Sequence, residues 1–172
     1  PRSTLFPYTT LFRSDYDGKL LFYTNGCAVM NRNHEVMPNG DSINAGQWFD
    51  IYWKDCLYGY PGAQNCIIIK DLKNGNGYYL IQTPRVYFQG TKDSSTLYYS
   101  YIDMSLDGGK GDVTLKNIRF YDKLDLIYSY TTVIQDKKSD GFWLIQPKIG
   151  SSYLRFHFGK DGVQQYSDLE SH

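Results

Sequence analysis

Short stretches in which apolar and polar residues alternate recur along the chain, separated by clusters of Gly, Asn, Asp and Ser. Alternation with a period of two is typical of β-strands, and such clusters form the turns between them. The clearest strand candidates are 18–24, 66–70, 77–83, 96–104, 113–121, 131–135, 141–147 and 152–158. The pattern predicts an all-β chain in which only a short piece within 122–130 has the composition of a helix.

The pair Asn25-Gly26 separates the strand candidate 18–24 from a second apolar run at 27–31. Asn-Gly between two apolar runs is the strongest short-range signal for a β-hairpin, because both residues adopt the positive φ that the tight turn requires. Residues 31–46 are rich in turn formers and are expected to be a loop, with room for one short strand at 34–37.

One segment repeats: GYYLIQ at 77–82 is echoed by GFWLIQ at 141–146. Each copy follows an apolar strand and an Asp-containing turn (IIIKDLKNGNG and TVIQDKKSDG) and precedes an alternating aromatic strand. The alternative is two unrelated hairpins with a common apolar pattern. A repeat over about 66–104 and 132–163 predicts a partial β-propeller of two to three antiparallel blades, truncated at both ends. Neighbouring blades would bury the faces that one blade leaves open.

The first fourteen residues differ in kind from the rest. The run TLFPYTTLFRS at 4–14 closely resembles the conceptual translation of a sequencing adapter. Its alternation would also suit a strand at the edge of the domain. Because of the adapter-like run, residues 1–14 are interpreted as an artefact and excluded from fold reasoning. Residues 15–172 are expected to be a propeller fragment whose natural chain begins further upstream.

Composition and charge support the same class and exclude others. The chain has 17 Tyr, 9 Phe, 3 Trp and 16 Gly, a combination that favours strands joined by turns. Lys plus Arg equals Asp plus Glu, at 18 each, so there is no electrostatic footprint for a nucleic-acid partner. No apolar run reaches the length of about 18 residues that spans a membrane.

The cysteines do not predict a metal or catalytic site. Cys27, Cys56 and Cys66 form an odd set without the paired spacing of a zinc site. Cys56 and Cys66 are placed to bridge the ends of one loop, and free or loop-bridged cysteines are favoured over a catalytic thiol.

No catalytic, cofactor-binding or metal-binding set is predicted, and no cofactor. His157, in RFHF, is expected to face solvent, and no triad partner is evident for His34, in a loop, or for His172, the last residue. Three carboxylates surround a Gly-rich stretch, namely Asp103, Asp107 and Asp112. Their presence would be explained either by a bound calcium ion or by a plain turn. Their spacing departs from the EF-hand pattern, so a turn is favoured.

Aromatic residues in expected loops are the candidates for ligand contact. They are Tyr58, Tyr60, Tyr87 and Phe88. Aromatic side chains on loops stack against sugars or anchor protein partners. The alternative is that they cover the edges of blades.

Several segments resemble secreted β-propeller-like proteins of Bacteroidota, and the resemblance runs from about residue 15 to residue 163. The matching pieces are 18–46, YGYPGAQNCIII at 58–69, YYSYIDMSLDGGKGDVTLKN at 98–117 and DGFWLIQPKIGSSYLRFHFGKDGV at 140–163. Such proteins are exported and carry type IX secretion sorting domains or gliding-motility-associated C-terminal domains. The resemblance implies a secreted or surface-anchored protein, and it transfers no catalytic residue. The stretch 125–141 departs from the familiar members.

The expected function is therefore a non-catalytic extracellular or cell-surface binding or scaffold module, part of a larger secreted protein, with a protein or glycan ligand. The alternative is a propeller-type hydrolase acting on polysaccharide. A hydrolase of this kind needs two carboxylates facing one cleft. Neither YYLIQ nor FWLIQ carries an acidic residue, which favours binding.

Overall fold

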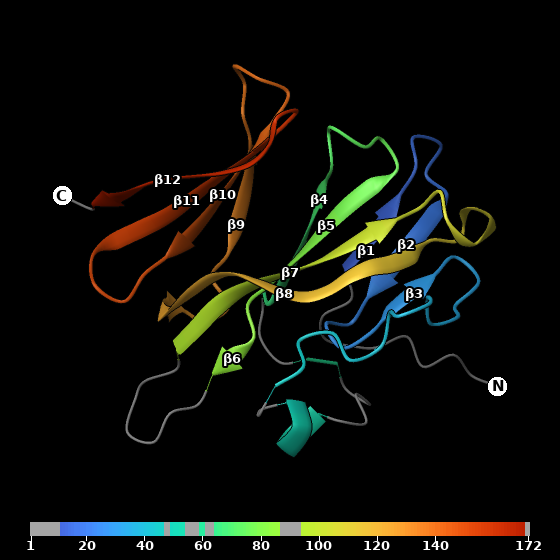
Figure 1. Cartoon of the computed structure of the whole chain (residues 1–172), viewed down its shortest axis with the longest axis horizontal. Helices are drawn as coiled ribbons and strands as arrows, with labels where there is room; N and C mark the ends of the chain where they lie inside the picture. Colours follow the sequence, from blue (N-terminus) through green and yellow to red (C-terminus); the bar gives the residue numbers. More distant parts are fainter. Residues whose placement is uncertain (1–10, 47–48, 54–58, 61–63, 87–93, 171–172) are drawn as a thin grey trace.

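The computed structural model of the chain describes residues 11–46, 49–53, 59–60, 64–86 and 94–170 (Figure 1). These residues form three antiparallel β-sheets, which confirms the all-β prediction. The helical elements among them are one turn of π-helix, η1 (Phe49–Trp53), and one 3-10 turn, η2 (Asp107–Gly109).

Sheet A has the strand order β1-β2-β3, with β1 (Leu11–Ser14), β2 (Leu20–Thr24) and β3 (Val29–Asn31). The hairpin predicted at Asn25-Gly26 is confirmed, because β2 and β3 pair antiparallel. Its loop has four residues, 25–28, and of the pair only Gly26 has a positive φ, of 81°. The Asn25 side chain accepts hydrogen bonds from the backbone N–H groups of Cys27 and Ala28. Strand β1 pairs with β2 at the sheet edge, the alternative that the sequence left open for this segment.

Sheet B consists of β4 (Cys66–Lys70), β5 (Gly77–Gln82), β6 (Arg85–Val86), β7 (Ser94–Asp103) and β8 (Asp112–Ile127). Strands β4, β5, β7 and β8 form a four-stranded meander, and β6 pairs with the start of β7. The expectation of helix within 122–130 is wrong for residues 122–127. That part of β8 stays extended because it pairs with β7 and buries Leu126 in the core.

Sheet C consists of β9 (Thr132–Gln135), β10 (Phe142–Pro147), β11 (Ser152–Gly159) and β12 (Gly162–Glu170). It too is a four-stranded antiparallel meander, in the order β9-β10-β11-β12. The two copies of the repeated hexapeptide fall on the second strand of each meander, namely β5 and β10. Sheets B and C are therefore built to the same strand plan.

Sheet B lies between the other two sheets, with sheet A on the right and sheet C on the left of Figure 1. Side chains alternate along each strand, so each sheet has two faces. The Leu80 face of sheet B packs on sheet A, and its members are Cys66, Ile68, Tyr78, Leu80, Ile102 and Val113. The Tyr79 face packs on sheet C, and its members are Ile67, Ile69, Tyr79, Ile81, Leu97 and Tyr99.

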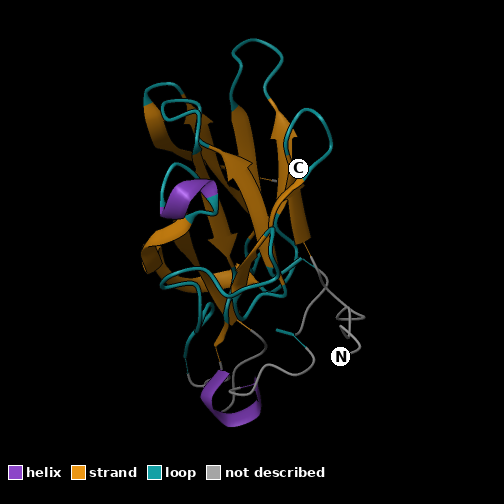
Figure 2. Cartoon of the chain, turned by 90° about the vertical axis from the view of Figure 1, so that its right-hand side faces the viewer, coloured by secondary structure: helices purple, strands orange, loops and turns teal. Residues whose placement is uncertain are grey.

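Sheet C meets sheet B through what we term the Leu144 face: Val133, Phe142, Leu144, Leu154, Phe156 and Phe158. Edge-to-face ring pairs join the two sheets, with Tyr79 and Phe158 centroids 5.4 Å apart and Phe120 and Phe156 centroids 5.0 Å apart. Most loops and turns gather at the ends of the strands (Figure 2). The described sheets form an open stack and not a closed ring.

Candidate functional site

The turn between β9 and β10 holds the side chain of His157 in place. Its Nε2 lies 3.2 Å from Oδ2 of Asp136 and 3.1 Å from Oγ of Ser139. The Ser139 hydroxyl donates to the same carboxylate at 2.7 Å, and the backbone N–H of Lys138 donates to it at 3.0 Å. These hydrogen bonds, led by that of the Lys138 amide, lower the pKa of Asp136.

This cluster is not a catalytic triad. In a Ser-His-Asp triad the carboxylate orients one ring nitrogen while the other nitrogen accepts the proton of the nucleophile. Here Asp136 and Ser139 both contact Nε2 of His157. His157 lies on the outward side of sheet C, as the alternation predicts, although other side chains largely cover it there. Its side chain is only 15% exposed, because the Trp143 ring packs on it with centroids 4.7 Å apart.

Sheet B contains the same arrangement with tyrosine in place of histidine. The Tyr101 hydroxyl donates to Oδ2 of Asp71 at 2.6 Å and lies 3.2 Å from the Asn74 amide nitrogen. The carboxylate of Asp71 also accepts from the backbone N–H of Lys73 at 2.8 Å. Tyr101 stacks edge-on with Tyr79 at 5.1 Å. The aromatic group therefore locks a turn in both sheets, a structural role.

A buried glutamine ends the repeated hexapeptide in each sheet, and each has 0% exposure. Gln82 accepts a hydrogen bond from Ser100 at 2.6 Å and donates to Asn117 at 2.8 Å. Gln146 accepts from the Thr131 hydroxyl and donates to the backbone carbonyl of Ile127 at 2.7 Å. Both amides are satisfied at both ends, as buried polar groups must be.

The outward side of sheet C is a candidate surface for interaction. We term it the Trp143 face, defined by Ile134, Trp143, Ile145, Tyr153, His157 and Tyr166. Ile134 is 50% exposed, and Tyr153 and Tyr166 are each 39% exposed. The Trp143 and Tyr166 rings meet edge-on, with centroids 4.9 Å apart, and the Arg155 guanidinium lies 5.8 Å from the Trp143 ring centroid. Exposed aromatic side chains on one sheet face, with Arg155 among them, make this face a candidate for contact with a partner.

Of the four aromatic loop candidates, Tyr60 is the one that falls within the described residues, and it is not available to a ligand. It is 1% exposed and packs with Cys27 and Phe49. The expectation that it is an exposed binding residue is therefore wrong. Tyr58, Tyr87 and Phe88 lie outside the described residues.

The cysteines pair differently from the loop bridge considered for Cys56 and Cys66. Cys66 is free and buried, which contradicts that bridge, and Cys27 is disulfide-bonded. Burial raises the pKa of the Cys66 thiol to about 12. Because the thiolate is the reactive form, Cys66 is unsuited to nucleophilic chemistry.

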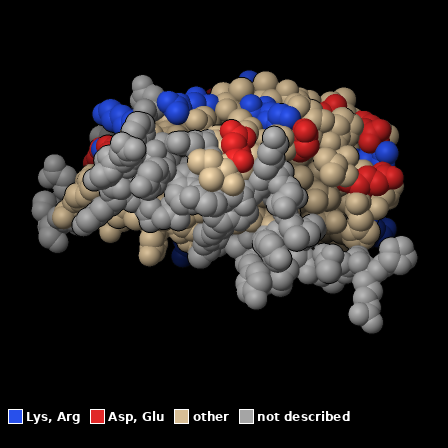
Figure 3. All heavy atoms as spheres, turned by 90° about the horizontal axis from the view of Figure 1, so that it is seen from below, with Lys and Arg blue, Asp and Glu red and all other residues tan. Residues whose placement is uncertain are grey.

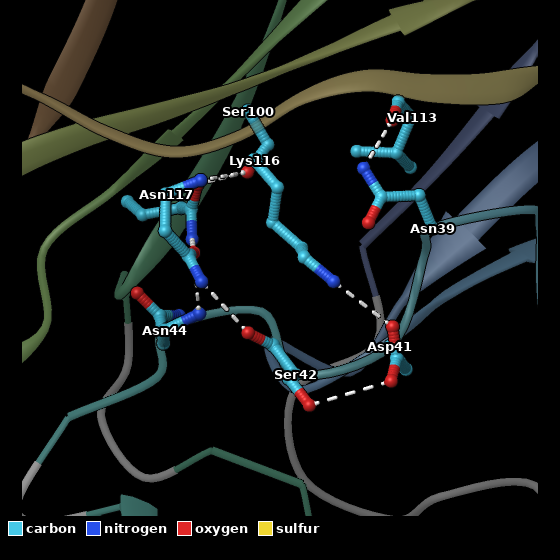
Figure 4. A network of polar contacts seen from close by, with 9 residues as sticks. Asn39, Asp41, Ser42, Asn44, Ser100, Val113, Lys116 and Asn117 are labelled. Carbon is cyan, nitrogen blue, oxygen red and sulfur yellow. Dashed lines mark hydrogen bonds and ion pairs between the residues drawn. The ribbon is translucent and has the colours of Figure 1, made fainter.

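A polar cluster attaches the loop after β3 to strand β8 (Figure 4). Asn117 has a φ of 53° within β8, and its side chain donates to the carbonyl of Ser42 at 2.8 Å and accepts from the backbone N–H of Asn44 at 3.1 Å. Lys116 pairs with Asp41 at 3.0 Å. Figure 4 shows these groups turned toward one another, so they act as a structural clamp.

The remaining ionisable candidates are explained by local structure. Asp103 accepts hydrogen bonds from the backbone N–H and the hydroxyl of Ser105, which confirms the turn interpretation, and Asp107 pairs with Lys110 at 3.0 Å. His34 lies 3.2 Å from the Tyr23 hydroxyl, and His172 lies outside the described residues.

A search of the described part of the chain for metal-binding groups of three or more His, Cys, Asp or Glu finds none. No helix in that part is long and apolar enough to cross a membrane. On the face drawn in Figure 3, basic side chains lie mainly along the upper edge from left to centre, and acidic side chains lie mainly at the centre and right.

Comparisons of the chain with models of protein families, with curated proteins and with solved structures found no match.

Proposed function

We propose that the chain is a non-catalytic binding or scaffold module of a larger secreted or cell-surface protein, with propeller-like blades as its building units. One observation carries this proposal. In both four-stranded meanders an aromatic residue holds a turn through a carboxylate, which we term the turn lock, and a glutamine is buried. The two sheets stack face to face, and the aromatic outward face of sheet C is left open to a partner.

The turn lock supports a binding role over an enzymatic one. His157 is the one histidine in contact with both a carboxylate and a hydroxyl among the described residues, and Tyr101 replaces it in the sister sheet. Tyr101, the counterpart of His157, cannot serve as a base at neutral pH, because a tyrosine hydroxyl has an ordinary pKa of about 10. The role that the two residues share is therefore structural.

Export is supported by the disulfide at Cys27. Structural disulfides form and persist mainly in oxidising compartments such as the periplasm and the extracellular space. A chain whose Cys27 is bonded while Cys66 stays free is consistent with folding in such a compartment.

The hydrolase alternative is not favoured. It requires carboxylates that face one cleft, and the edge strands β4 and β9, which occupy equivalent positions in their sheets, read CIIIK and TVIQ. Neither has an acidic residue.

A turnover screen tests the proposal. The purified chain is incubated with plant and algal polysaccharides, and release of reducing ends is measured beside binding to the same polysaccharides and to immobilised proteins. We expect binding without turnover. Turnover that co-purifies with the folded chain would show an enzyme and defeat the proposal, whereas equal turnover in a mock purification without the chain would indicate a contaminant.

A further inference from the structure

We propose that the Trp143 face of sheet C is the docking surface for one further four-stranded antiparallel sheet of the same repeat. The inference deepens the proposed function, since it names what this open face binds within a larger protein. It begins from the register of the two meanders.

Three residues of the Trp143 face have counterparts at the same register positions of sheet B. Trp143 lies opposite Ile134 and His157 across its strand pairs, and Tyr79 lies opposite Ile69 and Tyr101. Within the repeat, Ile134 therefore corresponds to Ile69. The exposure of the two differs sharply: Ile69 is 2% exposed because sheet C covers it, and Ile134 is 50% exposed.

The stack also has a direction. Sheet B turns its Leu80 face toward sheet A, and sheet C turns its Leu144 face toward sheet B. Leu80 and Leu144 hold the same position in the repeated hexapeptide. Each sheet thus packs its Leu face against the preceding sheet, and its other face, the Tyr79 face in sheet B, is the one on which the next sheet packs. In sheet C this other face is the Trp143 face.

This direction argues against sheets B and C of a second copy as the occupant. The matching surface is a Leu80-type or Leu144-type face, and both such faces of sheets B and C are already buried against their neighbours. A second copy therefore has no such face of sheet B or C left to insert. A further repeat has one of its own.

The surface chemistry agrees with a protein sheet as the partner. Trp143 and Tyr166 meet edge-on at 66°, so they form a ridged surface and not a flat platform for a sugar ring. The Tyr79 face, which docks a sheet, has the same edge-on packing between Tyr79 and Tyr101, at 74°. Ridged apolar surfaces interlock with the side chains of another sheet.

A tandem chain tests the proposal. Residues 128–170 are repeated after Glu170 of the full chain, so that the added unit supplies a fresh Leu144 face. Ile134→Glu is then introduced in the first copy of this segment only. Val36→Glu, a substitution of an apolar residue that is 52% exposed on the sheet A side, is the matched control.

We expect the added unit to fold, so the tandem should gain the β-sheet signal in circular dichroism that a second copy of sheet C would contribute. In the parent, Ile134→Glu should leave the melting temperature unchanged. In the tandem it should lower it by about 4–8 °C or more, since a carboxylate would be buried in an apolar interface. Val36→Glu should change neither chain.

Three results would overturn the proposal. The first is a tandem in which Ile134→Glu is as harmless as in the parent. The second is a tandem whose added strands do not fold, so that its circular dichroism shows no more β-sheet than that of the parent, since that unit already folds on sheet B. The third is a parent dimer that Ile134→Glu dissociates, which would identify a second copy as the occupant. Polysaccharide turnover would defeat the proposed function and would leave these results unaffected.

Discussion

The ring of His157 lies directly over Gly141, so that a Cβ built on Gly141 would stand 2.6 Å from Nε2. Tyr101 covers Gly77 in the same way. Because Asp136 and Trp143 both hold the imidazole, the ring has little freedom to move aside. The glycine that opens each copy of the hexapeptide is thus required by the aromatic group on the next strand.

The first prediction is that Gly141→Ala destabilises the fold. Overpacking of this kind typically lowers the free energy of unfolding by about 1–3 kcal/mol. Urea unfolding followed by circular dichroism measures the change. Gly75→Ala is the control, because a Cβ there meets nothing within 4 Å and no positive φ is involved.

A double substitution separates this steric cause from a general effect of alanine. Removing the ring in Gly141→Ala/His157→Ala should recover part of the loss, so the two single effects should not add. Simple additivity would show that the ring is not the cause.

The second prediction concerns the buried amide of Gln146. Gln146→Met keeps the length of the side chain and leaves Thr131 and the carbonyl of Ile127 without their partner. Unsatisfied buried groups cost about 1–3 kcal/mol of unfolding free energy. Gln135→Met, on the exposed end of β9, should stay within about 0.5 kcal/mol of the parent. Equal effects at both positions would contradict the proposed role of the amide.

Much of the fold follows from local pattern. The Asn25-Gly26 hairpin and the strands β5 and β10 are readable because alternation and turn residues act over short distances. The equivalence of Tyr101 and His157 is not readable, because the two residues differ in type and their spacing from the hexapeptide differs between copies. Strand register alone reveals it.

The candidate surface could have been found by following the alternation further. In GFWLIQP and SYLRFHF both faces of the strand carry large side chains, which indicates a sheet buried on two sides. A loop position does not imply exposure: Tyr60 lies in a loop and is nevertheless buried, because its side chain packs on Cys27 and Phe49. The end of β8 is extended although its local composition favours a helix, because its pairing with β7 overrides that preference.

The third prediction concerns acid. The pKa of Asp136 is lowered in the fold, so this group stabilises the folded state above its ordinary pKa of about 3.9, and the contribution is lost as the pH falls below that value. Asp136→Asn should therefore flatten the decline of the unfolding free energy between about pH 4 and pH 2. Asp161→Asn, on an exposed turn, should leave the decline unchanged. A decline that Asp136→Asn fails to alter would show that this carboxylate is not linked to folding.

The fourth prediction concerns the thiols. Burial raises the pKa of Cys66 to about 12, so at pH 8 roughly one thiol in 10⁴ is ionised, and Ellman's reagent should not react with the native chain. In guanidinium Cys66 should react and Cys27 should not, and after reduction all 3 cysteines should do so. A non-reducing peptide map should recover the Cys27 peptide in disulfide linkage, and reduction should lower the free energy of unfolding by about 2–5 kcal/mol. Three reactive thiols in guanidinium without reduction would show that Cys27 is not bonded, and with it the argument for an oxidising compartment would fall.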